Sequence, residues 1–215
     1  MLADPEKAAL GAAWEPARRA GVLGNASIEE LWEHTAGFTT AVCSAFSAEC
    51  STWNGRILDA GTGAGIPGVL LARQFPEAEV TLVDSSERRL DHARAAVRAL
   101  GVTDRVQIQH ARMDDLAHKS SHRSAYEVVV ARLLAEPPEA AELLLPCVLP
   151  GGVAVVSCRR QQLAEWRTLP EVISAIGSVE ALTTAGGAFV IVSVTDELPS
   201  IYPRRSVARS RKPLI

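Results

Sequence analysis

The sequence predicts an α/β protein with a doubly wound, mostly parallel sheet of seven strands and an N-terminal helical cap. Three observations predict this fold. Short apolar runs alternate with amphipathic stretches from residue 56 onward. A glycine-rich turn follows the first apolar run, and a Gly-Gly turn joins the last two. The length of 215 residues suits one such domain with a short appendage.

Residues 1–55 are expected to form a helical extension. A first helix is predicted over residues 5–19, where the glycines that follow end it. Ser27 and Glu30 form a capping box, which predicts the start of a longer amphipathic helix that continues to residue 46. These helices would cover either the edge of the sheet or the ligand.

Residues 56–198 are expected to form the α/β domain, and residues 199–215 a basic tail. The predicted strands cover residues 56–60, 79–84, 106–110, 127–131, 153–158, 179–183 and 189–194. The predicted helices cover residues 66–74, 87–100, 113–116, 138–147 and 163–176. The polar loop 117–124 has no apolar anchor and is expected to be mobile. The Pro-Gly-Gly at 150–152 is expected to turn the chain into the fifth strand.

The most informative motif is RILDAGTGAGIPG at residues 56–68. Asp59 closes the first strand, and four glycines follow, at positions 61, 63, 65 and 68. Glycine tolerates positive φ and lets the backbone approach a ligand closely, and Pro67 falls at about the first helical position, where its missing N–H costs nothing. A dinucleotide needs an open helix N-terminus for its pyrophosphate, whereas a carboxylate suits the sulfonium and ammonium of S-adenosylmethionine. The motif therefore favours S-adenosylmethionine; a turn that only packs is the alternative.

Asp84 closes the second predicted strand, 23 residues after the first glycine of the turn. An acidic residue at that place in a doubly wound sheet accepts hydrogen bonds from the ribose hydroxyls of a bound nucleotide. The alternative is that Asp84 caps the next helix, although Ser85 or Ser86 could do so instead. The glycine turn favours the ribose role, and Ser85 beside Asp84 is predicted as a further cofactor contact.

Two further strand ends carry candidate cofactor contacts. After the third strand, Met113 could cover an adenine ring and Asp114 could accept from its exocyclic amine; alternatively, Asp114 or Asp115 begins a short helix. Arg132 ends the fourth strand at the carboxyl edge, where open α/β sheets bind ligands. It could bind the cofactor carboxylate or a substrate phosphate, or it could pair with Glu136 structurally.

Several motifs are absent, and their absence narrows the reaction. The fourth strand lacks the Asn/Asp-Pro-Pro-aromatic element expected for methylation of an exocyclic amine, and no GxSxG, HExxH or P-loop occurs. The histidines and the four cysteines show no metal spacing and no CxxC, so no metal is expected and the thiols are expected to be reduced. An acceptor atom that needs no general base is consistent with this pattern.

The chain is expected to be a cytoplasmic monomer with no membrane partner. No stretch of about 18 apolar residues occurs, and the N-terminus carries acids where a signal peptide would carry bases.

The C-terminal tail points to a nucleic-acid partner. Residues 201–215 hold five cationic side chains and no carboxylate, so a net charge of −3 for the whole chain leaves −8 on the rest. Clustered Lys and Arg bind phosphate backbones, and Tyr202 offers a stacking face. The predicted RNA contacts are Tyr202, Arg204, Arg205, Arg211 and Lys212. A solvated charged end is the alternative.

Together these motifs resemble the glucose-inhibited division protein B family, bacterial methyltransferases that modify guanine N7 in 16S ribosomal RNA. LDAGTGAGIPG, TLVDSSERR, VVVAR, LPGG and YPRR…RKPL occur in the family's order over about residues 28–215. The resemblance implies a Rossmann-like class I methyltransferase. It also implies S-adenosylmethionine in contact with Gly61, Gly63, Gly65, Ile66, Asp84, Met113, Asp114 and Arg132.

The sequence departs from the family's pattern on the substrate side. His34-Thr35-Ala36-Gly37 stands where an Asp-Ser pair usually follows the His, and Cys158-Arg159 replaces Lys-Gly. Val207 and Arg209 replace Gly and Pro. The leading hypothesis is methylation of guanine N7 in small-subunit ribosomal RNA. A divergent paralogue that methylates a small molecule or another acceptor, and a non-catalytic RNA-binding or assembly factor, stay open because fold alone does not choose.

Overall fold

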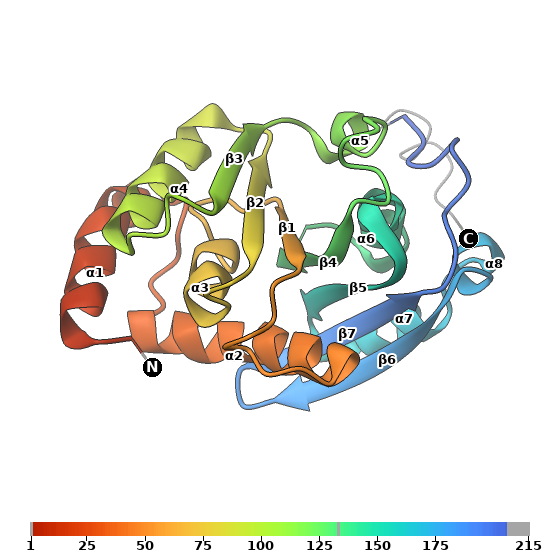
Figure 1. The fold of residues 1–215 in the computed structure, drawn as a ribbon, viewed down its shortest axis with the longest axis horizontal. Coiled ribbons are helices and arrows are strands. Elements are labelled where there is room, and N and C mark those ends of the chain that lie inside the picture. Colours follow the sequence, from red (N-terminus) through yellow and green to blue (C-terminus); the bar gives the residue numbers. More distant parts are fainter. Residues whose placement is uncertain (1, 133, 206–215) are drawn as a thin grey trace.

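The computed structural model describes residues 2–132 and 134–205, and it confirms the predicted sheet (Figure 1). Seven strands lie in the order β3-β2-β1-β4-β5-β7-β6. All are parallel except β7, which runs antiparallel to both of its neighbours. The strands are β1 (Arg56–Ala60), β2 (Glu79–Asp84), β3 (Val106–His110), β4 (Tyr126–Arg132), β5 (Val148–Cys158), β6 (Gly177–Thr184) and β7 (Gly187–Val194).

Helices cover both faces of the sheet, with one apolar core on each face. Consecutive residues of a strand point to opposite faces, so Ile57 joins one core while Leu58 joins the other. The first core includes side chains of α1 (Asp4–Arg19), α2 (Ile28–Phe46), α3 (Gly68–Gln74) and α4 (Glu87–Ala99). The second includes side chains of α5 (Met113–Leu116), α6 (Pro137–Leu144), α7 (Leu163–Arg167) and α8 (Glu171–Ser174).

The N-terminal helices share the core of the domain. The predicted capping box is present: the Glu30 N–H donates to Ser27 Oγ over 3.1 Å, and the Ser27 N–H donates to Glu30 Oε2 over 2.6 Å. Helix α2 packs against β5 and β7, and α1 packs against α4 (Figure 1). Trp14 of α1 is fully buried, and its indole N–H donates to the Ala64 carbonyl over 2.8 Å. The first helix therefore supports the glycine turn directly.

The segment His34-Thr35-Ala36-Gly37, which departs from the family's pattern, packs α2 onto the β6–β7 hairpin. A Cβ on Gly37 would lie 2.1 Å from Cε2 of Phe189, so glycine permits the close approach of helix and strand. His34 Nδ1 lies 2.7 Å from the Gly186 carbonyl oxygen. Thr35 is buried, and its hydroxyl donates to the Leu31 carbonyl. The contacts of this segment are therefore packing contacts beneath the sheet.

Two sequence-based boundaries were wrong. Strand β5 begins at Val148, so the Pro-Gly-Gly at 150–152 lies within the strand and not in a turn before it. The pairing register with β4 shifts between Tyr126 and Val128, and Gly151 has φ of +88°, a conformation that favours glycine. The helix expected over residues 163–176 is two short helices, α7 and α8, because Pro170 disfavours a helical residue before it.

The polar loop 117–124 is anchored, although the sequence predicted a mobile loop. Arg123 donates from Nη1 to the Tyr202 carbonyl over 2.8 Å and from Nη2 to the Leu198 carbonyl over 2.5 Å. His118 Nε2 lies 2.9 Å from the Pro203 carbonyl oxygen. The partners lie about 80 residues away in sequence, so the loop and the start of the tail hold each other. In the part of the chain that the structure describes, no helix is long and apolar enough to span a bilayer.

Candidate active site

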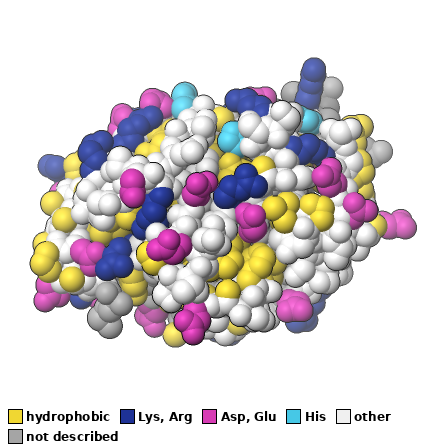
Figure 2. Space-filling view, viewed as in Figure 1, with side chains coloured by type: hydrophobic (Ala, Val, Ile, Leu, Met, Phe, Trp, Pro, Cys, Tyr) yellow, Lys and Arg dark blue, Asp and Glu magenta, His cyan; other side chains and the backbone are white. Residues whose placement is uncertain are grey.

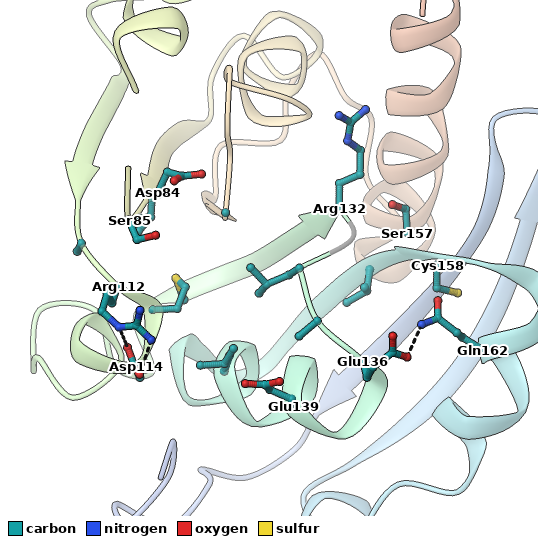
Figure 3. A pocket seen from close by; sticks show the side chains of 18 of the residues that line it. Asp84, Ser85, Arg112, Asp114, Arg132, Glu136, Glu139, Ser157, Cys158 and Gln162 are labelled. Carbon is teal, nitrogen blue, oxygen red and sulfur yellow. Dashed lines mark hydrogen bonds and ion pairs between the residues drawn. The ribbon is translucent and has the colours of Figure 1, made fainter. Parts of the chain in front are cut away.

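A cavity of about 640 Å³ opens at the carboxyl ends of the parallel strands, where open α/β sheets bind ligands (Figure 3). Residues from the ends of β1, β2, β3, β4 and β5 line it. The fold thus brings together six predicted cofactor contacts from four separate segments of the chain. These are Gly61, Asp84, Ser85, Met113, Asp114 and Arg132.

A second cavity of about 290 Å³ lies beside the first and shares Gly61, Arg89 and Arg132 with it. Its wall consists of the glycine turn, residues 20–23 after α1, and Arg88 at the start of α4. The predicted contacts Gly63 and Ile66 line this second cavity. The predicted contacts Asp59 and Gly65 line neither cavity.

The glycine turn leaves its backbone open toward the second cavity. Gly63 has φ of +58°, in the left-handed region, and no atom lies within 4 Å of the position that a Cβ would take. Its N–H donates to Asp84 Oδ2 over 2.9 Å. Pro67 precedes the first helical residue, because α3 begins at Gly68. At Gly63 the turn therefore has open space beside its backbone, which a ligand contact at this position would need.

Asp59 builds the turn from the inside and does not reach either cavity. The side chain is fully buried, and Oδ2 accepts from the Gly68 N–H over 2.8 Å and from the Thr62 hydroxyl over 2.6 Å. A Cβ on Gly68 would lie 2.7 Å from the same Oδ2 atom, so glycine is required there. Its position supports a role in the turn and does not support the predicted contact with the cofactor.

Burial raises the pKa of Asp59 to about 6, against the hydrogen bonds from Thr62 and Gly68, which lower it. We therefore compare the free energy of unfolding of the wild type with that of Asp59→Asn. The wild-type value minus the variant value should fall by up to about 3 kcal/mol as the pH rises from about 4 to about 6. In that window the unfolded carboxyl ionises while the folded one keeps its proton. Urea unfolding of both proteins between pH 4 and pH 8 measures this difference; a constant difference would contradict the prediction.

Asp84 lines the first cavity and is only 3% exposed. Its carboxylate accepts from the N–H groups of Gly63 and Ser86, each over 2.9 Å, and Arg89 Nη1 lies 3.7 Å from Oδ1. A carboxylate offers about four acceptor positions, so these contacts leave capacity for ribose hydroxyls. The bond from Ser86 also orders the start of α4, and the ribose and capping roles are therefore compatible.

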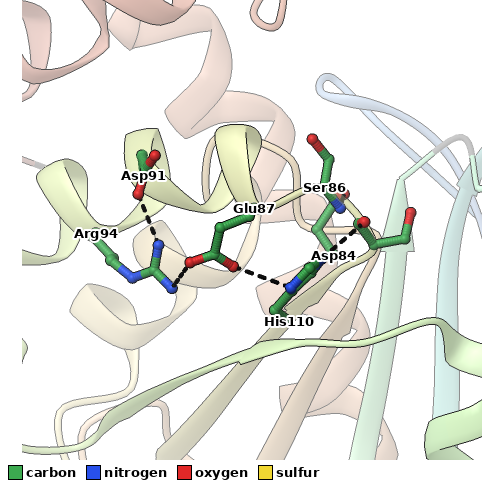
Figure 4. A network of polar contacts seen from close by, with 7 residues as sticks. Asp84, Ser86, Glu87, Asp91, Arg94 and His110 are labelled. Atoms are coloured by element: carbon green, nitrogen blue, oxygen red, sulfur yellow. Dashed lines mark hydrogen bonds and ion pairs between the residues drawn. The ribbon is translucent and has the colours of Figure 1, made fainter.

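A polar network next to Asp84 fixes the strand ends around it (Figure 4). Glu87, the first residue of α4, lies 3.4 Å from the His110 ring at the end of β3 and 2.7 Å from Arg94 Nη2. Arg94 also donates to Asp91 over 2.8 Å. These contacts connect α4 to β3, and His110 Nε2 lies 3.1 Å from the Ser85 carbonyl oxygen, which connects the ends of β2 and β3.

The β3 end of the cavity carries a pair that sequence reasoning missed. Asp114 accepts from Arg112 Nε over 3.0 Å and from Nη2 over 3.2 Å (Figure 3). This contact raises the pKa of Arg112. Met113 is buried, 7% exposed, and α5 begins there, so Asp114 is both a first-turn residue and a cavity residue. The spacing of Arg112 and Asp114, two residues apart after β3, was the sequence signal for this ion pair.

Arg132 is half-buried between the two cavities. Burial lowers the pKa of its guanidinium, and the charge of Asp59 opposes that shift. Glu136, which the sequence suggested as a structural partner of Arg132, accepts a hydrogen bond from Gln162 Nε2 over 2.8 Å. The guanidinium is thus placed where an anionic group of a ligand in either cavity would meet it.

The β4 and β5 side of the cavity is built from residues that the sequence did not single out as site residues. Glu136 and Glu139 come from the start of α6, Gln162 from the 3₁₀ turn η2 (Arg160–Gln162), and Trp166 from α7. Cys158 and Arg159, which depart from the family's pattern, also line this side. The sequence held one signal for these residues: polar side chains follow β4 and β5 closely, and the carboxyl ends of these two strands lie at the same edge of the sheet.

The start of the tail is held by a buried ion pair, and this changes the role of one predicted RNA contact. Arg204 donates to Glu142 Oε1 from Nε over 2.9 Å and to Oε2 from Nη2 over 2.8 Å, while its N–H donates to Oε1 over 2.7 Å. The Glu142 side chain is 1% exposed and that of Arg204 is 17% exposed. These contacts make Arg204 an anchor, contrary to the predicted RNA contact.

The other predicted RNA contacts of the tail stay predictions. Tyr202 is half-buried against the second core, and Arg205 is exposed. Arg211, Lys212, Val207 and Arg209 lie outside the described residues. On the face shown in Figure 2, Lys and Arg side chains are interspersed with Asp and Glu over the domain.

A left-handed glycine turn after β1, an acid at the end of β2 and a cavity along the carboxyl edge define the class of protein: an S-adenosylmethionine-dependent methyltransferase of the α/β type. The family model described as rRNA small subunit methyltransferase G matches residues 14–188. The chain belongs to this family, as its motifs predicted.

Individual relatives agree with the family match. The ribosomal RNA small subunit methyltransferase G of Rubrobacter xylanophilus is 32% identical over 209 residues, which cover 92% of this chain and 78% of the relative. The protein of the same name from Deinococcus deserti is 34% identical over 169 residues, covering 75% and 69%.

Solved structures support the fold at low sequence identity. A Corynebacterium glutamicum protein superposes with a TM-score of 0.57 at 19% identity, covering 88% of this chain and 91% of that one. An O-methyltransferase family protein from Burkholderia thailandensis gives a TM-score of 0.54 at 15% identity, covering 74% and 56%. At these identities the likeness shows the fold alone.

Proposed function

We propose that this protein transfers the methyl group of S-adenosylmethionine to N7 of a guanine in small-subunit ribosomal RNA. The family and the relatives bear the name of that RNA class. The observation that carries the proposal is one continuous cavity whose lining runs from the ends of β2 and β3 to the ends of β4 and β5. We assign the ends of β2 and β3 to the nucleoside of the cofactor (the nucleoside side) and the ends of β4 and β5 to the methyl acceptor (the acceptor side). The protein would act where ribosomal RNA lies, in the cytoplasm.

The described residues fit the cofactor. Asp84 keeps acceptor capacity for the ribose hydroxyls, and Met113 and Asp114 lie beside it for the adenine. The amino-acid end would extend past Gly63 into the second cavity, where Arg132 can meet its carboxylate. Two adjoining cavities that share Gly61, Arg89 and Arg132 suit an elongated ligand with an anion at one end.

The acceptor side suits an atom that carries its own lone pair. The cofactor supplies an electrophilic methyl group, and guanine N7 can accept it without loss of a proton. Among the described residues that line the first cavity there is no histidine. The one thiol among them, that of Cys158, has its pKa raised by burial, so it stays protonated and is a poor base. Catalysis would therefore rest on positioning N7 in line with the methyl group.

A deletion strain tests the proposal. Mass spectrometry of its 16S ribosomal RNA should show the loss of one 7-methylguanosine, and the purified protein with S-adenosylmethionine should restore it on small subunits from that strain. An unchanged RNA profile would refute the assignment. A missing mark that the purified protein cannot restore would favour the non-catalytic assembly factor.

A divergent acceptor is the second candidate, and one observation favours it. Cys158 and Arg159 replace the usual Lys-Gly, and both line the acceptor side of the cavity. In that case the protein would bind S-adenosylmethionine in calorimetry, yet leave small subunits from the deletion strain unmethylated.

A further inference from the structure

The acceptor side of the cavity holds one carboxylate in a defined orientation. Glu136 Oε2 accepts from Gln162 Nε2 over 2.8 Å, and Gln162 Oε1 accepts from the Arg159 backbone N–H over 3.0 Å (Figure 3). The Arg159 N–H fixes which end of the Gln162 amide is the oxygen, so the nitrogen must face Glu136. The glutamine is thus bonded at both ends, and it holds Glu136 as an acceptor facing the cavity.

This carboxylate lies opposite the nucleoside side. Glu136 directly precedes α6 at the end of β4, and Gln162 comes from η2 after β5. In Figure 3 the two side chains lie across the cavity from Asp84, Ser85 and Asp114. A base between the two sides would present one edge to the cofactor and the other to Glu136.

The chemistry of the carboxylate selects among bases. An ionised carboxylate has only acceptors. On its Watson–Crick edge, guanine presents two adjacent donors, N1–H and the N2 amino group, and a carboxylate can accept both. Adenine presents an acceptor, N1, at the corresponding place and would face the carboxylate with a repulsive lone pair. Resting on the proposed function, we infer that Glu136, positioned by Gln162, recognises the Watson–Crick edge of the acceptor guanine.

The same contact places the reacting atom. N7 lies on the imidazole side of the purine, away from N1 and the N2 amino group. With its Watson–Crick edge at Glu136, guanine therefore turns N7 toward the nucleoside side of the cavity, where the methyl donor would lie. The Glu136 carboxylate would thus both select guanine and orient its N7 atom toward the methyl donor.

Glu136 also acts on the transition state. Methyl transfer to N7 forms the N7–C bond as the C–S bond breaks; the electron pair of that bond goes to sulfur, and the positive charge moves to the purine ring. No proton is transferred. The hydrogen bonds from N1–H and N2–H to a carboxylate strengthen as the ring becomes cationic, so they stabilise the transition state more than the ground state.

Methylation kinetics test the inference with the full-length protein and small subunits from the deletion strain. For Glu136→Gln we expect kcat/KM to fall about ten- to hundredfold, with part of the loss in kcat. The dissociation constant of S-adenosylmethionine, measured by calorimetry, should stay within about twofold of the wild-type value. Glu165→Gln, which removes an exposed carboxylate of α7 outside the cavity, is the matched control for loss of charge.

Nucleotide binding tests the contact without catalysis. Guanosine and inosine monophosphates differ only in the N2 amino group, and NMR titrations with S-adenosylhomocysteine present compare them. We expect the wild type to bind the guanine nucleotide several-fold more tightly, and Glu136→Gln to lose this preference. The inference would be overturned if the wild type showed no preference for the guanine nucleotide or if Glu136→Gln kept it. It would also be overturned if Glu139→Gln, and not Glu136→Gln, lost the preference.

The two assays separate this inference from the proposed function. If the wild type fails to methylate small subunits, the proposed function is wrong, and the nucleotide titrations still decide whether Glu136 reads guanine. If the wild type methylates them and Glu136→Gln does so at the same rate, the role of Glu136 is wrong and the proposed function stands.

Discussion

Arg204→Met should lower the free energy of unfolding by about 3 to 5 kcal/mol, because it leaves the Glu142 carboxylate buried without its cation. Both partners are largely removed from water, with the side chain of Glu142 only 1% exposed. In a chain of this size, each kcal/mol corresponds to roughly 2 to 4 °C in melting temperature. Calorimetric or circular-dichroism melting of the two proteins measures the change.

The neighbouring arginine provides the control. Arg205 is exposed, and Arg205→Met should change the stability by less than about 0.5 kcal/mol. Glu142→Leu combined with Arg204→Met should recover part of the loss, because no uncompensated charge is then buried. Equal melting temperatures for Arg204→Met and Arg205→Met would show that the ion pair contributes nothing.

The ion pair also relates the tail to the acceptor side of the cavity. Helix α6 carries Glu142 near its end and is immediately preceded by Glu136. Arg123 adds a second attachment through the carbonyls of Leu198 and Tyr202. Residues 198–204 are therefore held next to the helix that helps form the acceptor side. We expect Arg205, which is exposed, to contact RNA next to the guanine being methylated.

Much of the fold could be predicted because local and tertiary signals agree there. The bounds of β1, β2 and β3 match the prediction, since β1 and β2 are short and largely apolar and β3 alternates apolar and polar residues, as a strand does. The Pro-Gly-Gly at 150–152 is a local turn signal, yet pairing with β4 keeps it within β5. The apolar periodicity of residues 163–176 predicts one helix, but Pro170 interrupts it, and the chain forms two short helices on either side of the proline.

The nucleoside side of the site was predictable and the acceptor side was less so. Glycine turns and the acid after β2 occupy fixed places in this fold, so sequence position alone points to Gly61 and Asp84. Glu136 and Gln162 are distant in sequence, and neither belongs to a motif. The partnership of Arg204 with Glu142 likewise depends on how the tail folds back, which charge counting does not reveal.

Asp84→Asn should raise the dissociation constant of S-adenosylmethionine about 100-fold. The substitution removes the charge from hydrogen bonds to two ribose hydroxyls, and a hydrogen bond to a charged group contributes about 1.5 to 3 kcal/mol. Asparagine also brings a donor NH₂ group where the N–H groups of Gly63 and Ser86 need acceptors. Isothermal titration calorimetry gives the constant, and S-adenosylhomocysteine serves as a second ligand.

Because Asp84 orders the turn as well as the ribose site, lost binding must be separated from lost structure. Asp104→Asn removes an exposed carboxylate from the loop before β3, outside both cavities, and should leave the dissociation constant unchanged. If Asp84→Asn melts cooperatively within a few degrees of the wild type and still binds about 100-fold more weakly, the carboxylate acts on the ligand. Affinity within about threefold of the wild type would exclude Asp84 from the ribose contact, and the glycine turn with Arg132 would then have to hold the cofactor.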